Sequence, residues 1–384
     1  MKSLLCFLLL SFSVYSQKTT EKIFSTSLNE NREITIGLPS NYDKNPTKRY
    51  PILILLDSEF LFDPFSGAIN YGSYWDNMPE TIIVGINQNQ KNERHDDCSV
   101  NENENEEILT KKGSQFFDFI GRDLIPYIEK KYRVAPFRII AGLDTTAGFL
   151  NFFLFNTNPI FDAFISLSPE LANGMENQIL NSMSNSKKTI FYYQSISTED
   201  VKFIKEPVLK LDEALSKVTN SNFKYKFDAF ENTTHYSLVL YSIPNVLNHI
   251  YESYKPISTT EFQQKIVVLQ SGFVDYLSKK YALISSILGL KIPIRINDFK
   301  AIEAAILKNN AYPELEKLSE IAKKNYPKSM LPDYELGLMY EKMGDSKKAA
   351  QKYQQASQKE AIGDLNKDMM FAKYDEMKSL TPKK

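Results

Sequence analysis

Short apolar runs that alternate with longer amphipathic stretches most limit how this chain can fold. Tyr50–Leu56, Thr81–Ile86 and Arg138–Ala141 are such runs, and the first is apolar throughout. A continuous apolar run of this length is typical of a strand buried on both faces of a sheet. Phe116–Tyr132, which precedes the third run, carries apolar residues at helical spacing. Strands joined by helices predict an α/β fold with a mainly parallel sheet.

Further strands are predicted on both sides of these runs, at Ile34–Leu38, Phe161–Leu167, Thr189–Tyr193 and Lys224–Phe230. The character of the sequence changes near residue 258, after which apolar residues recur every three or four positions. We therefore expect an α/β domain at residues 17–255 and an all-helical domain at residues 256–384.

The helical part contains small and large residues spaced as in tetratricopeptide repeats, which are pairs of closely packed helices. The residues that fit this pattern are Leu336, Gly337, Tyr340, Gly344, Ala349, Tyr353 and Ala356. A weaker copy precedes them at residues 302–327. Since so few repeats cannot bury a full solenoid core, we expect them to pack on other helices, on the first domain or on a protein partner.

The N-terminus resembles a cleavable secretory signal. Lys2 is followed by the apolar run Leu4–Val14 and then by Ser16-Gln17. The run is too short to span a bilayer, so residues 1–16 are predicted to be a signal peptide and the mature protein to be periplasmic or secreted, without a membrane span. Only Cys98 remains after cleavage, which excludes an internal disulfide. The formal net charge of -1 gives no reason to expect a nucleic-acid partner.

The segment after the third run resembles a nucleophile elbow, the strand-to-helix turn that carries the nucleophile of α/β-hydrolases in the pattern G-x-Ser-x-G. It reads Gly142-Leu143-Asp144-Thr145-Thr146-Ala147-Gly148 and leads into an apolar stretch. Small residues are needed at such a turn because backbone segments come into contact there. The leading glycine is present, but Asp144 occupies the position of the serine.

The sequence on either side of the elbow closely resembles the putative-esterase family, which includes esterase D and the enterochelin esterases. The resemblance covers roughly residues 30–253. The motifs that carry it are Arg32–Pro39, Tyr50-Pro51, Leu55-Leu56-Asp57, Arg94 with Asp97, Phe116–Ile120, Leu124–Ile128, Tyr132-Arg133, Phe161-Asp162-Ala163 and Ser166-Leu167-Ser168-Pro169.

The resemblance implies an α/β-hydrolase fold and a set of site residues. His235 matches the catalytic base, and Glu199, or its neighbour Asp200, matches the acid that orients the base. Backbone N–H groups near Ser58–Glu59 and at Thr145 match the oxyanion hole, although position 58 is often glycine in relatives. The resemblance implies no metal and no cofactor.

Asp144 decides between the possible functions. Attack of a carboxylate on an ester carbonyl would give a high-energy anhydride, so ordinary serine-esterase chemistry is not expected. The first hypothesis is a binding or interaction protein that holds a small ester-like ligand, or contacts a protein through its helical region. The alternatives are an active hydrolase of carboxylic esters, siderophore-like or small acyl esters, and an aspartate-nucleophile hydrolase resembling haloalkane dehalogenases and epoxide hydrolases.

Two electrostatic expectations complete the site. Arg94 and Asp97 are expected to form a structural ion pair beneath the site. An ionised Asp144 close to His235 is expected to raise the pKa of the imidazole, because a neighbouring anion favours its charged form.

The mature chain is predicted to begin near Gln17, because the long apolar segment of the N-terminus has the form of a removable signal. N-terminal sequencing or intact mass of exported material measures this directly. A retained Met1, or an acyl chain on Cys6, would contradict it.

Overall fold

The computed structural model describes residues 18–89, 91–101 and 108–381, and the chain divides into two compact units, residues 1–250 and 251–384. This division falls a few residues before the boundary at residue 255 that the sequence predicts. The expected signal peptide at residues 1–16 lies outside the described residues.

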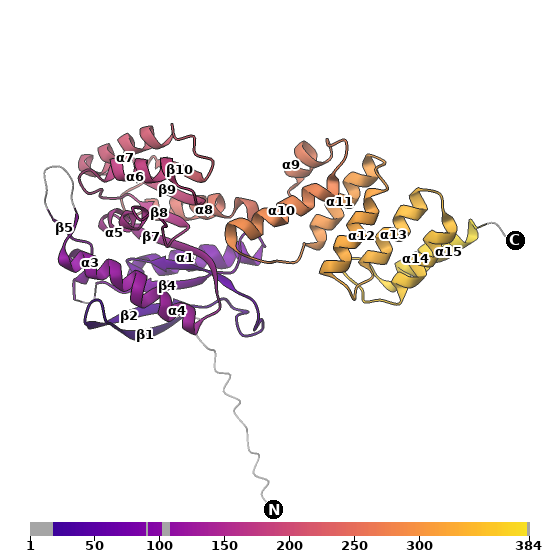
Figure 1. Ribbon diagram of the computed structural model, residues 1–384, viewed down its shortest axis with the longest axis horizontal. Coiled ribbons are helices and arrows are strands. Elements are labelled where there is room, and N and C mark those ends of the chain that lie inside the picture. Colours follow the sequence, from indigo (N-terminus) through magenta and orange to yellow (C-terminus); the bar gives the residue numbers. More distant parts are fainter. Residues whose placement is uncertain (1–17, 90, 102–107, 382–384) are drawn as a thin grey trace, which may run out of the picture. The chain divides into compact units, whose positions relative to one another are not determined.

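A mainly parallel sheet forms the centre of the first unit (Figure 1). In order across it, its eight described strands are β1 (Lys18–Ser25), β2 (Glu30–Gly37), β4 (Ile82–Ile86), β3 (Tyr50–Leu55), β7 (Val134–Leu143), β8 (Ala163–Leu167), β9 (Ile190–Ser197) and β10 (Phe223–Phe230). The pairs β1–β2 and β2–β4 are antiparallel, and all later pairs are parallel. β5 (Val100–Asn101) and β6 (Ile108–Leu109) form a separate two-stranded ladder. This architecture confirms the predicted α/β-hydrolase fold class.

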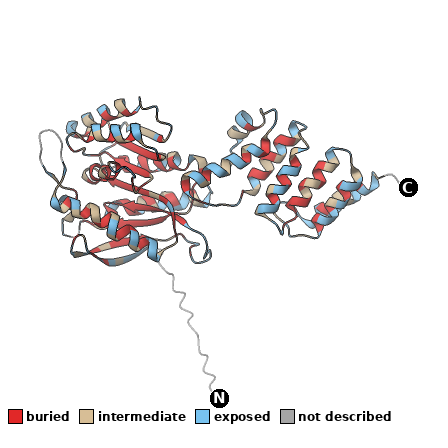
Figure 2. Cartoon of the chain, in the orientation of Figure 1, coloured by how far each residue is buried: buried red, intermediate tan, exposed pale blue. Residues whose placement is uncertain are grey.

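Helices cover both faces of the sheet. They are α1 (Ser58–Tyr74), α2 (Glu93–Asp97), α3 (Lys111–Asp118), the π-helix η1 (Phe119–Leu124), α4 (Ile125–Lys131), α5 (Thr145–Phe149), the 3₁₀-helix η2 (Leu150–Leu154), α6 (Met175–Asn185), α7 (Lys202–Leu215) and α8 (Leu238–Ile250). α1 and α8 pack against each other. The strands and the inward sides of the helices are buried (Figure 2).

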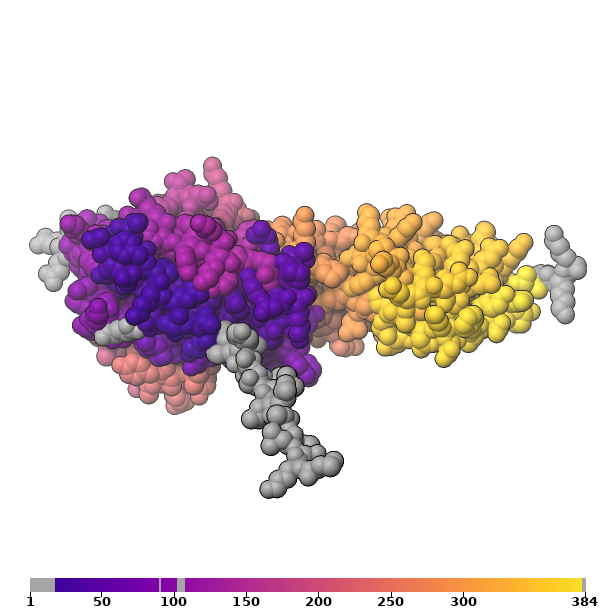
Figure 3. All heavy atoms as spheres, turned by 90° about the horizontal axis from the view of Figure 1, so that it is seen from below, coloured from indigo at the N-terminus to yellow at the C-terminus, as the bar shows by residue number. Residues whose placement is uncertain are grey.

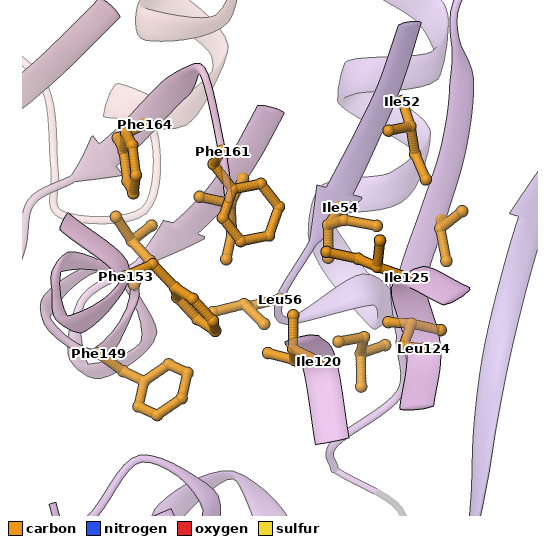
Figure 4. Packing of buried hydrophobic residues seen from close by; sticks show 14 of the residues in the cluster. Ile52, Ile54, Leu56, Ile120, Leu124, Ile125, Phe149, Phe153, Phe161 and Phe164 are labelled. Carbon is orange, nitrogen blue, oxygen red and sulfur yellow. The ribbon is translucent and has the colours of Figure 1, made fainter. Parts of the chain in front are cut away.

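Central strands are apolar on both faces because each face packs on helices. In β3 every residue is buried. The alternate side chains Ile52 and Ile54, followed by Leu56, lie in one apolar cluster with residues of η1 and of the α5–η2 segment, such as Ile120 and Phe153 (Figure 4). Burial on both faces explains why β3, β4 and β7 appear in the sequence as continuous apolar runs.

The edge strand β1 was not predicted. Six of its eight residues are polar or charged, and its first residues are exposed. The N-terminal segment, indigo in Figure 3, lies on the surface that this view shows. An edge strand packs little apolar surface, so its sequence carries a weak hydrophobic pattern.

The second unit is helical throughout its described residues. Its elements are η3 (Glu252–Tyr254), α9 (Thr259–Glu261), the π-helix η4 (Phe262–Ile266), α10 (Phe273–Leu288), α11 (Ile296–Lys308), α12 (Glu314–Asn325), α13 (Leu331–Lys342), α14 (Ser346–Ser357) and α15 (Lys367–Ser379). Consecutive helices from α12 to α15 pack on one another around a continuous apolar core. The tetratricopeptide assignment stays a prediction. No described helix of either unit combines the length and the apolar content needed to cross a membrane.

Gly337 and Gly344 shape the hairpin of α13 and α14. Gly344 lies between the two helices with φ of 82°, a conformation that favours glycine. A Cβ added at Gly337 would lie 2.7 Å from Cε1 of Tyr353, whose side chain is fully buried. The close approach of α13 and α14 therefore depends on the missing side chain at position 337.

We predict that Gly337→Ala lowers the free energy of unfolding of the helical unit by about 1–3 kcal/mol, because the added methyl group overpacks the hairpin. Chemical denaturation of the full chain, followed by circular dichroism, measures the change. Gly67→Ala is the control, since a Cβ there meets nothing within 4 Å and should be neutral or slightly stabilising. An unchanged or higher stability for Gly337→Ala would contradict the prediction.

Candidate active site

The turn between β7 and α5 places Asp144 in a strained backbone conformation, with φ of 60° and ψ of -122°. Positive φ is uncommon for residues other than glycine and costs about 1–3 kcal/mol. Hydrogen bonds hold the turn. The Asp144 N–H donates to the Leu167 carbonyl at 2.9 Å, and its carbonyl accepts from the N–H groups of Gly148 at 3.0 Å and Glu170 at 3.2 Å.

Glycines at both ends of this turn allow the backbone segments to approach. A Cβ at Gly148 would lie 1.9 Å from the Glu170 carbonyl oxygen, and one at Gly142 would lie 2.6 Å from Thr146 Oγ1. The sequence thus builds a sharp elbow although its side chain is a carboxylate. The Asp144 side chain is 28% exposed, so solvent and ligands can reach it.

His235 lies in the loop between β10 and α8, and its ring is fixed by Asp200. Its Nδ1 is 2.8 Å from Asp200 Oδ1. The other oxygen, Asp200 Oδ2, accepts hydrogen bonds from Ser168 Oγ and the Ser197 N–H, both at 2.7 Å. Asp200 is buried, so its carboxylate is held in one orientation. This leaves Nε2 as the ring atom that can serve a ligand.

The assignment of Glu199 as the partner of His235 was wrong, and the alternative Asp200 holds that place. After β9 the chain turns, with the Asp200 N–H donating to the Ser197 carbonyl at 3.1 Å. The turn directs Asp200 inward and leaves Glu199 exposed. Sequence alone could not choose between adjacent carboxylates, because the choice depends on the local turn.

Ser168 is a site residue that the sequence analysis did not single out. It follows β8 with φ of 42°, and its buried Oγ lies 3.2 Å from His235 Nδ1 in addition to its bond to Asp200. The signal was present in the motif Ser166-Leu167-Ser168-Pro169. That motif ends a predicted parallel strand, and ligand-binding residues of α/β sheets gather at such ends.

The pKa values of the pair shift in opposite directions. The hydrogen bond that His235 Nδ1 donates to Asp200 raises the pKa of His235, burial opposes this, and the negative charge of Asp144 adds a smaller increase. Burial would raise the pKa of Asp200, but hydrogen bonds from His235 and Ser168 outweigh it and lower that pKa. The expected rise for His235 is therefore present, but its main cause is Asp200 rather than Asp144.

Arg94 joins the elbow to the start of α1. The expected pair of Arg94 with Asp97 was wrong, because Arg94 Nε instead donates to Asp57 Oδ1 at 2.6 Å. Its Nη2 donates to the Leu143 carbonyl at 2.9 Å, and its Nη1 lies 3.6 Å from Asp144 Oδ2. One guanidinium thus faces both a fully buried carboxylate and the carboxylate of the elbow.

Asp97 pairs with Arg32 through two hydrogen bonds of 2.8 Å and 2.5 Å. Gln88 connects the two ion pairs, since its Nε2 donates to Asp97 Oδ2 at 3.2 Å and its Oε1 accepts from the Asp57 N–H at 3.3 Å. Removing one member of a buried ion pair leaves an uncompensated charge. The spacing of these residues along the chain gave no indication of which charges would pair.

Thr146 and the predicted oxyanion donors lie at the starts of two helices. Thr146 Oγ1 donates to Asp57 Oδ2 at 2.6 Å, which ties α5 to α1. Ser58 and Glu59 begin α1, and Thr145 begins α5. The first N–H groups of a helix have no intrahelical acceptor, so the predicted oxyanion donors lie at positions where backbone amides are not used by the helix itself.

An apolar cleft of about 250 Å³ adjoins these residues. Leu143, next to Asp144, and Tyr236, next to His235, both line it. The other lining residues are Phe60, Pro64, Val239 and Leu240. The cleft fits an apolar group attached to whatever reaches the elbow and the histidine.

Two other kinds of chemistry find no support. Among the described residues, no cluster of histidine, cysteine and carboxylate side chains is arranged to hold a metal ion. Cys98 is buried, and burial raises the pKa of its thiol well above the ordinary value, so thiolate chemistry is disfavoured.

The first unit is similar to esterases and other hydrolases. Residues 25–182 match the model of the family described as Putative esterase. An uncharacterised protein from Capnocytophaga ochracea shares 26% identity, with a TM-score of 0.86 over 94% of this chain and 100% of that one. An IroE-like serine hydrolase from Shewanella oneidensis shares 19% identity, with a TM-score of 0.59 over 80% of this chain and 99% of that one.

A siderophore hydrolase, EstB from Aspergillus nidulans, shares 14% identity, with a TM-score of 0.50 over 64% of this chain and 96% of that one. No curated protein sequence matched the chain. The first unit therefore has a hydrolase-like fold, and the family match over residues 25–182 confirms the resemblance stated from the sequence.

We predict that Asp200→Asn lowers the pKa of His235, because an amide cannot stabilise the imidazolium as a carboxylate does. NMR titration of the imidazole resonances measures this, and the chain has only three histidines to assign. Glu199→Gln, at the exposed neighbour, is the control and should leave the titration unchanged.

The His235–Asp200 pair should also make the stability of the fold depend on pH. A raised histidine pKa stabilises the fold fully below the pKa of the unfolded chain, about 6.5, and this contribution is lost as pH rises through the folded value. Asp200→Asn should therefore cost more stability near about pH 5 than near about pH 9. An equal cost at both pH values would contradict the assigned pair.

Proposed function

We propose that this protein hydrolyses carboxylic esters with an apolar acyl group. Its first unit has a hydrolase-like fold and matches the esterase family model over residues 25–182. The observation that carries the proposal is the pair of His235 Nδ1 and buried Asp200 Oδ1 at 2.8 Å, next to the apolar cleft. A histidine held by a carboxylate is the arrangement that general-base catalysis requires. The IroE-like serine hydrolase and the siderophore hydrolase among the structural neighbours support a hydrolytic reaction.

Water is the nucleophile in this proposal. Because Asp144 would form an anhydride by attacking a carbonyl, the base has no serine to activate. His235 Nε2 takes a proton from a water molecule as that water attacks the ester carbonyl carbon, and the imidazolium returns the proton to the departing alkoxide. The amides of Glu59 and Thr145 would donate to the oxyanion. Asp200 keeps its charge throughout and stabilises the imidazolium.

Binding without turnover is the second candidate, and the charge at the elbow favours it. The Asp144 carboxylate lies beside the helix starts where the oxyanion would form, and it is only partly compensated by Arg94 at 3.6 Å. An anion at this place repels the developing oxyanion. In this case the cleft would hold an ester-like ligand that is not cleaved.

We also propose that the protein acts outside the cytoplasm and that its helical unit contacts a protein partner. The signal-like N-terminus supports the first statement. Exposed apolar side chains on and just after α15, namely Met369, Phe371 and Leu380, support the second.

We predict that the wild-type protein hydrolyses p-nitrophenyl acyl esters and that His235→Ala lowers kcat/KM by about 100-fold or more, since a positioned base contributes about 10²–10⁴. Asp200→Ala should lower it similarly, and Glu199→Ala is the matched control that should leave it unchanged. Asp144→Ser removes the anion and supplies a hydroxyl group, so we expect equal or higher activity.

Three results would change this assignment. Activity that is absent in the wild type but appears in Asp144→Ser would select binding without turnover. An alkyl ester on Asp144 in His235→Gln, formed from an alkyl halide by attack of the carboxylate on the saturated carbon with loss of halide and detected by mass spectrometry, would make the aspartate the nucleophile. Activity unaffected by His235→Ala would refute the proposed mechanism.

A further inference from the structure

Large apolar side chains stand exposed around the entrance to the His235–Asp200 pair. Tyr236 and Leu240 are 78% and 64% exposed although both line the cleft. We call the exposed members of the cleft lining, Phe60, Tyr236 and Leu240, the apolar collar. Exposed apolar groups that gather at one place mark a binding surface rather than ordinary surface composition.

Three separate elements bring these side chains to the same site. Phe60 lies in the first turn of α1, beside the predicted oxyanion donors. Leu240 lies in the first turn of α8. Tyr236 follows His235, and the centroids of their rings lie 5.2 Å apart. The collar therefore forms part of the cleft lining beside the His235–Asp200 pair.

The cleft and the collar together present more apolar surface than a short acyl group can cover. An acetyl or butanoyl group would fit within the cleft of about 250 Å³ and leave the collar in water. The lining of the cleft carries no charged side chain, so a charged or sugar-like acyl group would find no partner there. A chain that begins at the ester and continues outward would cover both the cleft and the collar.

We infer that the ligand of this site is an ester, or the corresponding acid, with an unbranched aliphatic acyl chain of about eight or more carbons, which lies in the cleft and over the apolar collar. The inference rests on the proposed function for the ester and deepens it by naming the acyl group. A protein covering the collar would close the path to His235, whereas a flexible chain leaves the carbonyl at the histidine. The geometry thus favours a lipid-like chain over a protein surface.

The test is a chain-length series of p-nitrophenyl esters from two to twelve carbons, at concentrations below aggregation, with the full chain. Burial of each methylene group is worth up to roughly fourfold in affinity. We expect kcat/KM to rise at least about tenfold from the four-carbon to the twelve-carbon ester. Leu240→Asn should reduce activity on the twelve-carbon ester several-fold more than on the two-carbon ester.

Leu209→Asn is the matched control, because Leu209 is an exposed leucine of α7 outside the collar. It should leave the whole series unchanged. A flat or falling chain-length profile in the wild type, or an equal effect of Leu240→Asn on all esters, would overturn the inference.

Calorimetric binding of dodecanoate separates this inference from the proposed function. Dodecanoate should bind the wild type and the control Leu209→Asn with similar affinity, and Leu240→Asn several-fold more weakly. If it binds in this way while no ester is cleaved, the acyl-chain site stands and the proposed hydrolysis fails. If short esters are cleaved through His235 but dodecanoate does not bind, the hydrolysis stands and the acyl-chain site fails.

Discussion

The buried Asp57–Arg94 ion pair is the contact on which the candidate site depends. Asp57 lies between β3 and α1 with φ of 54° and has a fully buried side chain, so its charge must be compensated within the protein. Arg94 supplies that compensation and also bonds the end of β7 through the Leu143 carbonyl. Thr146 bonds the same carboxylate from α5. One carboxylate therefore fixes the starts of two helices and the arginine beside Asp144.

The sequence predicted those structural features that depend on the local periodicity of apolar residues. The strands from β2 to β10 within the main sheet were predicted because strands that are buried on one or both faces have a recognisable pattern of apolar residues. β1 has only a weak hydrophobic pattern because most of its side chains are exposed. The elbow was found for a different reason, since glycines at 142 and 148 are required wherever backbone segments touch.

Pairing between distant charges could not be predicted. Arg94 and Asp97 are three residues apart, yet they bond Asp57 and Arg32, which lie on other segments. The choice of Asp200 over Glu199 likewise follows from a single turn after β9. Such contacts are set by the tertiary fold. The sequence pattern therefore identifies which charged residues belong to the site but not which of them pair with one another. The family resemblance narrowed the choice to two neighbouring carboxylates, which is as far as sequence could reach.

The charge balance at the elbow decides what chemistry is open to the site. The strained turn is held by backbone hydrogen bonds to Leu167, Gly148 and Glu170, so it would persist with any side chain at position 144 and does not by itself show catalysis. The side chain acts through its charge. Asp57 is compensated by its ion pair with Arg94, whereas Asp200 and Asp144 both favour the imidazolium form of His235. A general base must be unprotonated, so the same charges that orient His235 also shift its useful range to higher pH. Asp144 is the one carboxylate of the three that is exposed to solvent and ligand, so a ligand that displaces or covers it would alter the base directly.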